Sequence, residues 1–407
     1  MRRRRFLVLL GIFAFMAVIN AVAWGSEAFC NFYVRNVYPL WVNTYGRLTG
    51  IFPFSVGEIM MVVGLIVTAG AVVLGFIAVI FLITYKDSAI YREVRRFCAK
   101  YFTAYMWMLA GVFTVMTLNC FVPYHSSTLL ERYGMLGRMS ADDPLLGELL
   151  QKEYTLEELE NLRDYVVIRT NELAEQVERD GEGNIVYPDN MEEIAIESMK
   201  NLSQYCKQLE GYYPMPKEFY FSSFFSQQQM KGYFFPFSME VNYNNLMLHI
   251  NRPATICHEY AHLKGFMFEE EANLIGFLAC ANSSDVVFQY SGYLSILNYI
   301  NNEYYDAIGR NREIYDSHVK ISPLVRKENV FLQEETWEKV EANAILDTEV
   351  VDKVSDKLSE TSMVLNGVED GILSYTRVVG LLLYYYDGST EVQQTLADSG
   401  YLVHSQE

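Results

Sequence analysis

The sequence predicts a mainly α-helical protein, in which transmembrane helices at the N-terminus are followed by an α+β domain with a small sheet. Three observations support this prediction. Three long apolar runs lie within the first 125 residues. The rest of the chain is polar, and it is long enough to bury a core of its own. In that part, helical patterns dominate, and one short aromatic-rich stretch favours strands.

The apolar runs cover about residues 6–24, 56–83 and 102–121. Each is long enough to cross a bilayer as a helix. Ala21-Val22-Ala23 resembles a cleavage site, which leaves open the alternative that the first run is a signal peptide. The sequence therefore predicts a membrane region over residues 1–125 and a separate domain over residues 126–407.

Basic residues predict the orientation of the membrane region. Four arginines, Arg2 to Arg5, precede the first run, whereas the loop between the first and second runs holds only Arg35 and Arg47. The loop before the third run is basic, with Lys86, Arg92, Arg95, Arg96 and Lys100. Because basic segments stay on the cytoplasmic side, we expect a multi-pass cell-membrane protein with a cytoplasmic N-terminus and an extracytoplasmic C-terminal domain. Cleavage of the first run would not change this placement.

The net charge of the C-terminal domain makes some classes of binding partner unfavourable. Residues 1–101 hold eleven Lys or Arg and four Asp or Glu, a net charge of +7, and the remainder has 21 basic and 46 acidic residues, a net charge of −25. A domain this acidic is a poor ligand for nucleic acid or for an anionic lipid surface. No spacing among the six cysteines demands a disulfide, so buried free thiols are expected.

Several elements can be predicted along the polar part. A helix is expected over about Ser140–Val177, with Thr155 and Glu158 as a capping box, and another over Met191–Leu209, ended by Pro214 and Pro216. Short strands fit Gly232–Ile250. Beyond Leu274 the pattern is helical, including Tyr290–Tyr305, Glu334–Leu346, Val350–Leu365 and Tyr375–Tyr386.

One motif carries most of the chemical information. His258-Glu259-Tyr260-Ala261-His262 reads H-E-x-x-H, and it uses two of the six histidines in the chain. On a helix, positions i and i+4 share a face, so His258 and His262 can offer ring nitrogens to one Zn²⁺ ion. Glu259 can then act as general base on a zinc-activated water. The alternative is a solvated helix with two unrelated histidines.

A catalytic zinc site of this kind needs a third protein ligand and an open fourth position. Glu269, Glu270 and Glu271 follow the motif closely. If a helix starts at Glu269, its face also carries Ala272, Asn273 and Gly276, which are small enough to pack closely against the histidine helix. Glu269 is therefore the expected third ligand, Glu270 is the second choice, and Asn273 is expected to hydrogen-bond a ligand. Each glutamate can instead simply stabilise a helix N-terminus.

The run His258–Phe266, with Glu269-Glu270-Glu271-Ala272-Asn273 after it, resembles a bacterial membrane-protein family catalogued as domain of unknown function 3810. Two other stretches also resemble that family: Phe235-Pro236-Phe237 with Glu240 and Asn242, and Ser374-Tyr375 with Arg377-Val378-Val379.

The family looks like a branch of the gluzincin metallopeptidases, so the resemblance implies a zincin-like metallopeptidase domain. It also implies that His258, His262 and Glu269 bind zinc and that Glu259 is catalytic. Many gluzincins have Asp where this chain has Asn273, and a longer insert before the ligand glutamate; these departures leave the third ligand open.

The leading expectation is a membrane-anchored zinc metallopeptidase that hydrolyses peptide or protein substrates. A strand beside the active helix would hold an extended substrate by backbone pairing, unless this stretch is only a structural hairpin. The alternative function is a non-catalytic binding or sensing protein, which predicts either a closed structural site with a fourth protein group, such as Cys257 or Glu270, or no metal at all. The sequence does not give the substrate or the oligomeric state.

Overall fold

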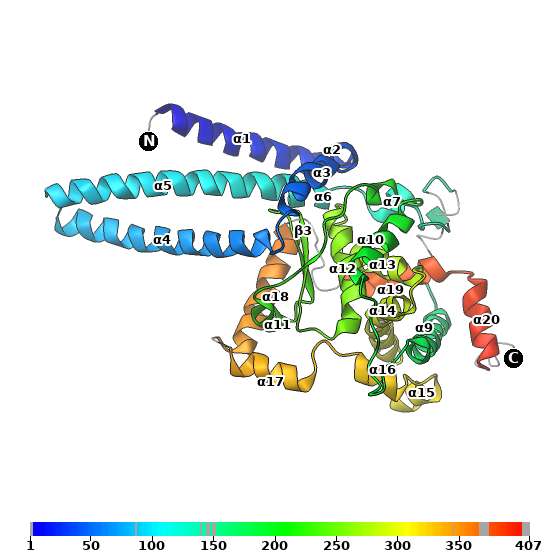
Figure 1. Cartoon of the computed structure of the whole chain (residues 1–407). Helices are drawn as coiled ribbons and strands as arrows, with labels where there is room; N and C mark the ends of the chain where they lie inside the picture. Colours follow the sequence, from blue (N-terminus) through cyan, green and yellow to red (C-terminus); the bar gives the residue numbers. More distant parts are fainter. Residues whose placement is uncertain are drawn as a thin grey trace. The chain divides into compact units, whose positions relative to one another are not determined.

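The computed structural model describes residues 3–85, 88–138, 141–143, 147–148, 152–344, 346–365 and 374–400. The chain is mainly helical, as predicted, and it divides into two compact units. The first unit comprises Met1–Ser126 and Phe235–Glu240, and the second comprises Ser127–Phe234 and Val241–Glu407 (Figure 1). The short segment Phe235–Glu240 therefore groups with the N-terminal unit, which the sequence pattern does not indicate.

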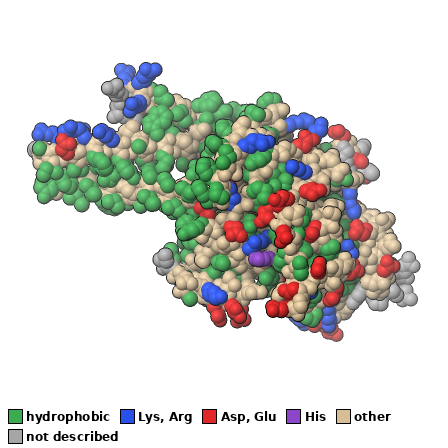
Figure 2. All heavy atoms as spheres, viewed as in Figure 1, with side chains coloured by type: hydrophobic (Ala, Val, Ile, Leu, Met, Phe, Trp, Pro, Cys, Tyr) green, Lys and Arg blue, Asp and Glu red, His purple; other side chains and the backbone are tan. Residues whose placement is uncertain are grey.

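Three helices of the first unit are long and apolar enough to cross a membrane, as predicted. They are α1 (Arg3–Gly25), α4 (Val56–Thr84) and α5 (Ala89–Met116), and the last continues through a π-helical turn, Thr117–Phe121, into α6 (Val122–Tyr124). Their large apolar side chains are mostly exposed, and Figure 2 shows them as a nearly continuous hydrophobic surface with Lys and Arg gathered at the helix ends. Such a surface is expected to contact lipid.

The connections in this unit are more helical than the sequence pattern predicts. The expected loop after the first apolar run forms α2 (Glu27–Asn36) and α3 (Tyr38–Thr49). The basic stretch before the third run is the start of α5, because Ser88 caps that helix and accepts a hydrogen bond from the backbone of Tyr91. At 1.5 Å per residue, the continuous helix is about 54 Å long, so it extends well past a hydrocarbon core of about 30 Å.

Phe235–Glu240 is fixed to the helices of the first unit by buried hydrogen bonds. The side-chain nitrogen of Asn119 donates to the carbonyl of Pro236 at 2.8 Å, and the hydroxyl of Thr49 donates to the carbonyl of Ser238 at 2.6 Å. The carboxylate of Glu240 accepts from the backbone nitrogen of Gly57 at 2.8 Å, at the N-terminus of α4. Asn119 lies in the π-helical turn, Thr117–Phe121.

The second unit is a layered helical body with one small sheet. Its core is formed mainly where α12, α13 and α14 pack on one another and on α9 and α19 (Figure 1). Its described helices are α7 (Leu129–Tyr133), α9 (Leu156–Gln176), α10 (Met191–Leu202), α11 (Ser222–Ser226), α12 (Arg252–Leu263), α13 (Glu269–Ala281), α14 (Val286–Ala307), α15 (Arg312–Ser317), α16 (Pro323–Glu328), α17 (Glu334–Ala342), α18 (Thr348–Leu365), α19 (Ser374–Tyr386) and α20 (Thr390–Asp398).

The first predicted helix of this unit is shorter than expected. The capping box of Thr155 and Glu158 is confirmed, and it starts α9 at Leu156. Residues 152–155 are not helical, and Ser140 lies outside the described residues.

The next helix is also shorter, because α10 ends at Leu202 instead of Leu209. There the hydroxyl of Ser203 donates to the carbonyl of Lys200 at 2.6 Å. Serine and asparagine side chains compete for backbone groups in this way and favour turns. Only a single 3₁₀ turn, Lys207–Leu209, follows.

The small sheet has three strands in the order β1–β3–β2, which confirms the predicted strands in part. The strands are β1 (Lys217–Glu218), β2 (Gly232–Phe235) and β3 (Glu240–Tyr243), and β1 runs parallel to β3. The expected strand over residues 245–250 is absent. The side chain of Asn244 accepts a hydrogen bond from the backbone of Leu246 at 3.0 Å, and this turn leads into a 3₁₀ helix, His249–Asn251.

Candidate metal centre

Helix α12 places both motif histidines on one face. Pro253 lies in its first turn, where a missing backbone donor costs nothing. His258 and His262 are one turn apart, and their Nε2 atoms lie 3.1 Å from each other. Both rings are mostly buried but keep some exposure to solvent, at 17% and 12% of the side chain. Two ring nitrogens therefore converge on one accessible point.

Helix α13 brings Glu269 to the same point. Glu269 is the first residue of that helix, and its carboxylate oxygens lie 3.3 Å from the Nε2 of His258 and 3.4 Å from the Nε2 of His262. The approach of the two helices depends on Gly276, because a Cβ there would lie only 3.0 Å from the backbone nitrogen of His258. The small face expected from the sequence thus packs against α12 as predicted.

The three side chains are close enough together to share one metal ion. With metal–ligand distances of 2.0–2.1 Å, the ligand atoms of a tetrahedral zinc site are about 3.3 Å apart. The two Nε2 atoms are 3.1 Å apart, and each lies 3.3 or 3.4 Å from a different carboxylate oxygen of Glu269. Two imidazoles and one carboxylate form a donor set that suits zinc. Among the described residues, His258, His262 and Glu269 form the group of His, Cys, Asp and Glu side chains that can share a metal.

The turn after α12 orients the ring of His262. The backbone nitrogens of Gly265 and Phe266 bond the carbonyls of His262 and Ala261, which is a Schellman motif, and Gly265 has the positive φ (+89°) that this motif requires. The carbonyl of Phe266 then lies 2.7 Å from the Nδ1 of His262. Since a carbonyl can only accept, Nδ1 carries a proton, and in the neutral form of the ring Nε2 is the nitrogen whose lone pair faces the centre.

The other two glutamates have separate partners. Glu270 is buried, and its carboxylate lies 3.5 Å from the guanidinium of Arg377 on α19. Glu271 accepts a hydrogen bond from the backbone nitrogen of Leu129 at 2.5 Å, at the N-terminus of α7. Burial raises the pKa of Glu271 to about 7. These partners separate Glu270, the second choice from sequence, from the histidine cluster.

Glu259 lies on α12 between the histidines, and strand β2 covers it. Its carboxylate accepts a hydrogen bond from the backbone of Phe234. Gly232 is packed so tightly that an added Cβ would lie 2.8 Å from both Cγ and Oε1 of Glu259 and 2.6 Å from a methyl of Thr255. Burial raises the pKa of Glu259 above its usual range, although the two histidines oppose this shift. A carboxylate tuned upward is better suited to take up a proton.

In the metal-free protein, His258, His262 and Glu269 interact electrostatically, and the interaction shifts the pKa values of His262 and Glu269. Burial opposes protonation of His262, but the carboxylate of Glu269 outweighs it and raises the pKa of His262 to about 9. Burial likewise disfavours the charged form of Glu269, but the two histidines hold its pKa well below the usual range. A cation at this position is therefore electrostatically favoured, whether it is a proton or a metal ion.

Two further residues considered from sequence have simpler surroundings. The side chain of Asn273 is half-buried, and in the described part of the chain it makes no hydrogen bond to His258, His262 or Glu269. Cys257 is fully buried, and it contacts Cys280 and the carbonyl of Ala195. Neither Cys257 nor Glu270 belongs to the three-residue cluster.

Three contributors were not identified from the sequence. Gly232 and the carbonyl of Phe266 act through backbone geometry, and Arg377 contacts a residue 107 positions away. The sequence signals were a glycine at the start of a predicted strand, Gly265 just after the histidine helix, and the stretch with Arg377 that resembles the family, and none of them indicated these contacts.

Fold and site together define a mainly helical protein with membrane-compatible helices and a two-histidine, one-glutamate cluster suited to a metal. Residues 33–383 match the family described as Protein of unknown function (DUF3810), and the chain belongs to this family. Comparison with curated proteins and with solved structures gave no match.

Proposed function

We propose that this protein is a membrane-anchored, zinc-dependent metallopeptidase. The observation that carries the proposal is the convergence of His258, His262 and Glu269 within metal-binding distance, with Glu259 adjacent on the same helix. When bound, zinc would supply a Lewis acid that polarises a peptide carbonyl and lowers the pKa of water.

The protein's own residues account for the proton transfers. Glu259 accepts the proton of the attacking water and passes it to the leaving amine. The hydrogen bond from Phe234 holds its carboxylate in one orientation, and burial makes it more basic than an exposed glutamate. The Nδ1 contact of His262 with the carbonyl of Phe266 selects the tautomer in which, once the ring is neutral, Nε2 can bind a metal.

Strand β2 is the proposed binding site for the peptide backbone. It is an edge strand of the sheet, and its residues Gly232 and Phe234 contact Glu259. An extended peptide that pairs with a free strand edge is aligned by main-chain hydrogen bonds and selected by its side chains. A peptide on this edge would run alongside the catalytic glutamate, which favours peptide substrates over small molecules.

The proposed topology has the N-terminus in the cytoplasm and the second unit outside. Support comes from the basic starts of α1 and α5: if α1, α4 and α5 cross the membrane in turn, Arg3–Arg5 and the α5 cations would lie on the same side. The first apolar helix is proposed to be retained, because Asn20 donates to the hydroxyl of Thr117 at 3.0 Å and Ala23 is buried. These contacts would be lost on cleavage after Ala23.

The non-catalytic alternative predicts either a closed four-ligand site or no metal at all. Within the described residues, no fourth His, Cys, Asp or Glu joins the three, and the two expected candidates, Cys257 and Glu270, contact other groups. An open coordination position is what a catalytic site needs. We therefore favour the peptidase.

The decisive experiment measures zinc content and peptide cleavage on the full-length protein in detergent. Wild type should bind one zinc ion and cleave members of a mixed peptide library. Glu259→Gln should keep the zinc and lose about 10²–10⁴-fold in kcat, the usual contribution of a general base. Glu269→Gln should weaken zinc binding, whereas the matched control Glu270→Gln should bind zinc like wild type.

Each outcome separates the hypotheses. One zinc ion with no cleavage in wild type would favour a structural or sensing site. Absence of zinc from folded wild-type protein would overturn the metal proposal. Equal loss of zinc from Glu269→Gln and Glu270→Gln would show that the third ligand is wrongly assigned.

A further inference from the structure

The charged segments of α1 and α5 end close to each other. Arg5 is the last charged residue of α1, and none follows before Gly25. Lys100 is the last charged residue of α5, and none follows before Met116. The two helices pack together within the first unit. Arg5 and Lys100 therefore mark where the polar ends of both helices give way to apolar segments.

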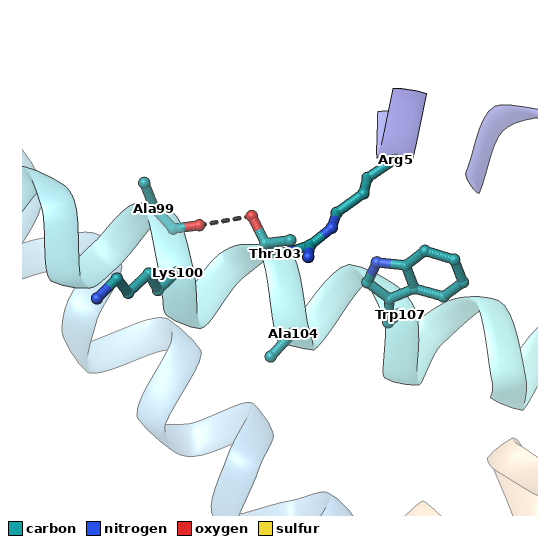
Figure 3. A pocket seen from close by; sticks show the side chains of 6 residues that line it. All are labelled: Arg5, Ala99, Lys100, Thr103, Ala104 and Trp107. Atoms are coloured by element: carbon teal, nitrogen blue, oxygen red, sulfur yellow. Dashed lines mark hydrogen bonds between the residues drawn. The ribbon is translucent and has the colours of Figure 1, made fainter. Parts of the chain in front are cut away.

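A cavity of about 550 Å³ lies at this boundary. Its lining combines two cations, a threonine, a tryptophan and two small residues, namely Arg5, Lys100, Thr103, Trp107, Ala99 and Ala104. Figure 3 shows the Arg5 side chain reaching from α1 to Thr103 and toward the indole of Trp107 on α5. The Thr103 hydroxyl donates to the carbonyl of Ala99 at 2.6 Å, so its oxygen can accept but does not neutralise a cation.

The cations of this cavity lack partners. In the described part of the chain, neither Arg5 nor Lys100 forms an ion pair or a side-chain hydrogen bond, and the indole N–H of Trp107 has no acceptor. By contrast, Arg96 on the same helix pairs with Glu93 at 2.7 Å. Two unpaired cations and a free N–H donor beside one cavity form a recognition site for an anion.

We propose that this cavity binds the phosphate of an anionic phospholipid, with Arg5 and Lys100 on the phosphate and Trp107 at the level of the lipid ester groups. Trp107 is seven residues beyond Lys100, about 10 Å deeper along the helix, where tryptophan is enriched at membrane interfaces. Basic pockets between membrane helices bind such headgroups. This inference is independent of the zinc site.

Exposed apolar side chains on the same two helices favour a lipid over free phosphate. Phe6 and Leu10 of α1 are each 54% exposed, and Met106 of α5 is 42% exposed. Acyl chains attached to the bound phosphate can cover these side chains, and burial of apolar surface favours binding. A free phosphate ion has no acyl chains to contact these side chains, so we expect the site to bind a lipid.

The test measures lipid binding to the full-length protein by native mass spectrometry from detergent. Wild type should retain phosphatidylglycerol at least tenfold more tightly than phosphatidylcholine, and millimolar inorganic phosphate should not displace it. Arg5→Gln/Lys100→Gln should lose this preference. Arg92→Gln/Arg96→Gln, which removes the same charge outside the cavity, should keep it.

Three results would overturn the proposal. They are equal binding of the two lipids by wild type, displacement by inorganic phosphate, and equal loss of preference in the two double variants. The wild-type comparison needs no substitution, so it remains decisive if a variant fails to fold. The charge-preserving Arg5→Lys provides a further check, because it should retain most of the preference.

Discussion

Gly276→Ala is the sharpest test of how the candidate metal centre is assembled. A Cβ at this position would lie 3.0 Å from the nitrogen and 3.2 Å from the Cα of His258, and 3.3 Å from the carbonyl oxygen of Ala254. All three are backbone atoms of α12, which cannot rotate away. Since comfortable contacts are 3.5–4.0 Å, we expect α13 to move away from α12 by about 0.5 Å.

This displacement should weaken metal binding. Glu269 belongs to α13, whereas His258 and His262 belong to α12. Metal sites tolerate only about 0.2 Å of error in ligand distance, so we expect zinc affinity to fall about tenfold, or about 1.4 kcal/mol. Competition with a chelator would measure the affinity of the detergent-purified protein.

Gly380→Ala is the matched control. Gly380 is also a helix-interior glycine, on α19, and an added Cβ there meets nothing within 4 Å. Both substitutions gain about 1 kcal/mol of helix propensity, and only Gly276→Ala adds overpacking of about 1–3 kcal/mol. The two unfolding free energies should therefore differ by about 1–3 kcal/mol. If Gly276→Ala binds zinc like wild type and is as stable as Gly380→Ala, the reasoning is refuted.

Three further predictions concern the same site. Gly265→Ala should lose about 1–2 kcal/mol of stability, because its φ is positive, and should also bind zinc more weakly. Gly183→Ala, where φ is also positive but an added Cβ meets nothing, should lose stability alone. Equal zinc affinities of the two variants in chelator competition would contradict this prediction. Cys257→Ala should keep one zinc ion by elemental analysis and lose about 1 kcal/mol of stability, and loss of zinc would instead identify Cys257 as a ligand. In the metal-free protein, the raised pKa of His262 contributes stability that is fully present below pH 6.5 and is lost as the pH rises to about 9. Denaturation of wild type in the presence of chelator should show this decline. A similar decline in Glu269→Gln would refute the carboxylate of Glu269 as the cause of the raised pKa.

The membrane-compatible helices and the histidine–glutamate cluster could be predicted from local sequence. Long apolar runs specify their own helices, and the i, i+4 spacing of His258 and His262 fixes their common face. Glu269 could be predicted as the third member of the cluster, because the face of small residues that it shares with Gly276 is evident from a few adjacent residues. The helices α2 and α3 were missed because they are short and carry mixed polar and apolar residues, which resemble a loop.

The rest of the site depends on contacts between distant segments. Arg377 separates Glu270 from the cluster, and Gly232 lies against Glu259 only because the sheet brings β2 over α12. Neither contact could be predicted from the periodicity of apolar residues in the sequence. The roles of zinc, of Glu259 and of Asn273 remain predictions, since they concern chemistry that a fold does not itself display.

The grouping of Phe235–Glu240 with the N-terminal helices gives these helices a structural role in the second half of the chain. The strand that covers Glu259 leads directly into a turn whose carbonyls are held by Asn119 and Thr49. A chain cut after Ser126 would lose both donors and leave Glu240 without its partner at Gly57. We therefore expect truncation at this point to leave the polar groups of Phe235–Glu240 without these partners.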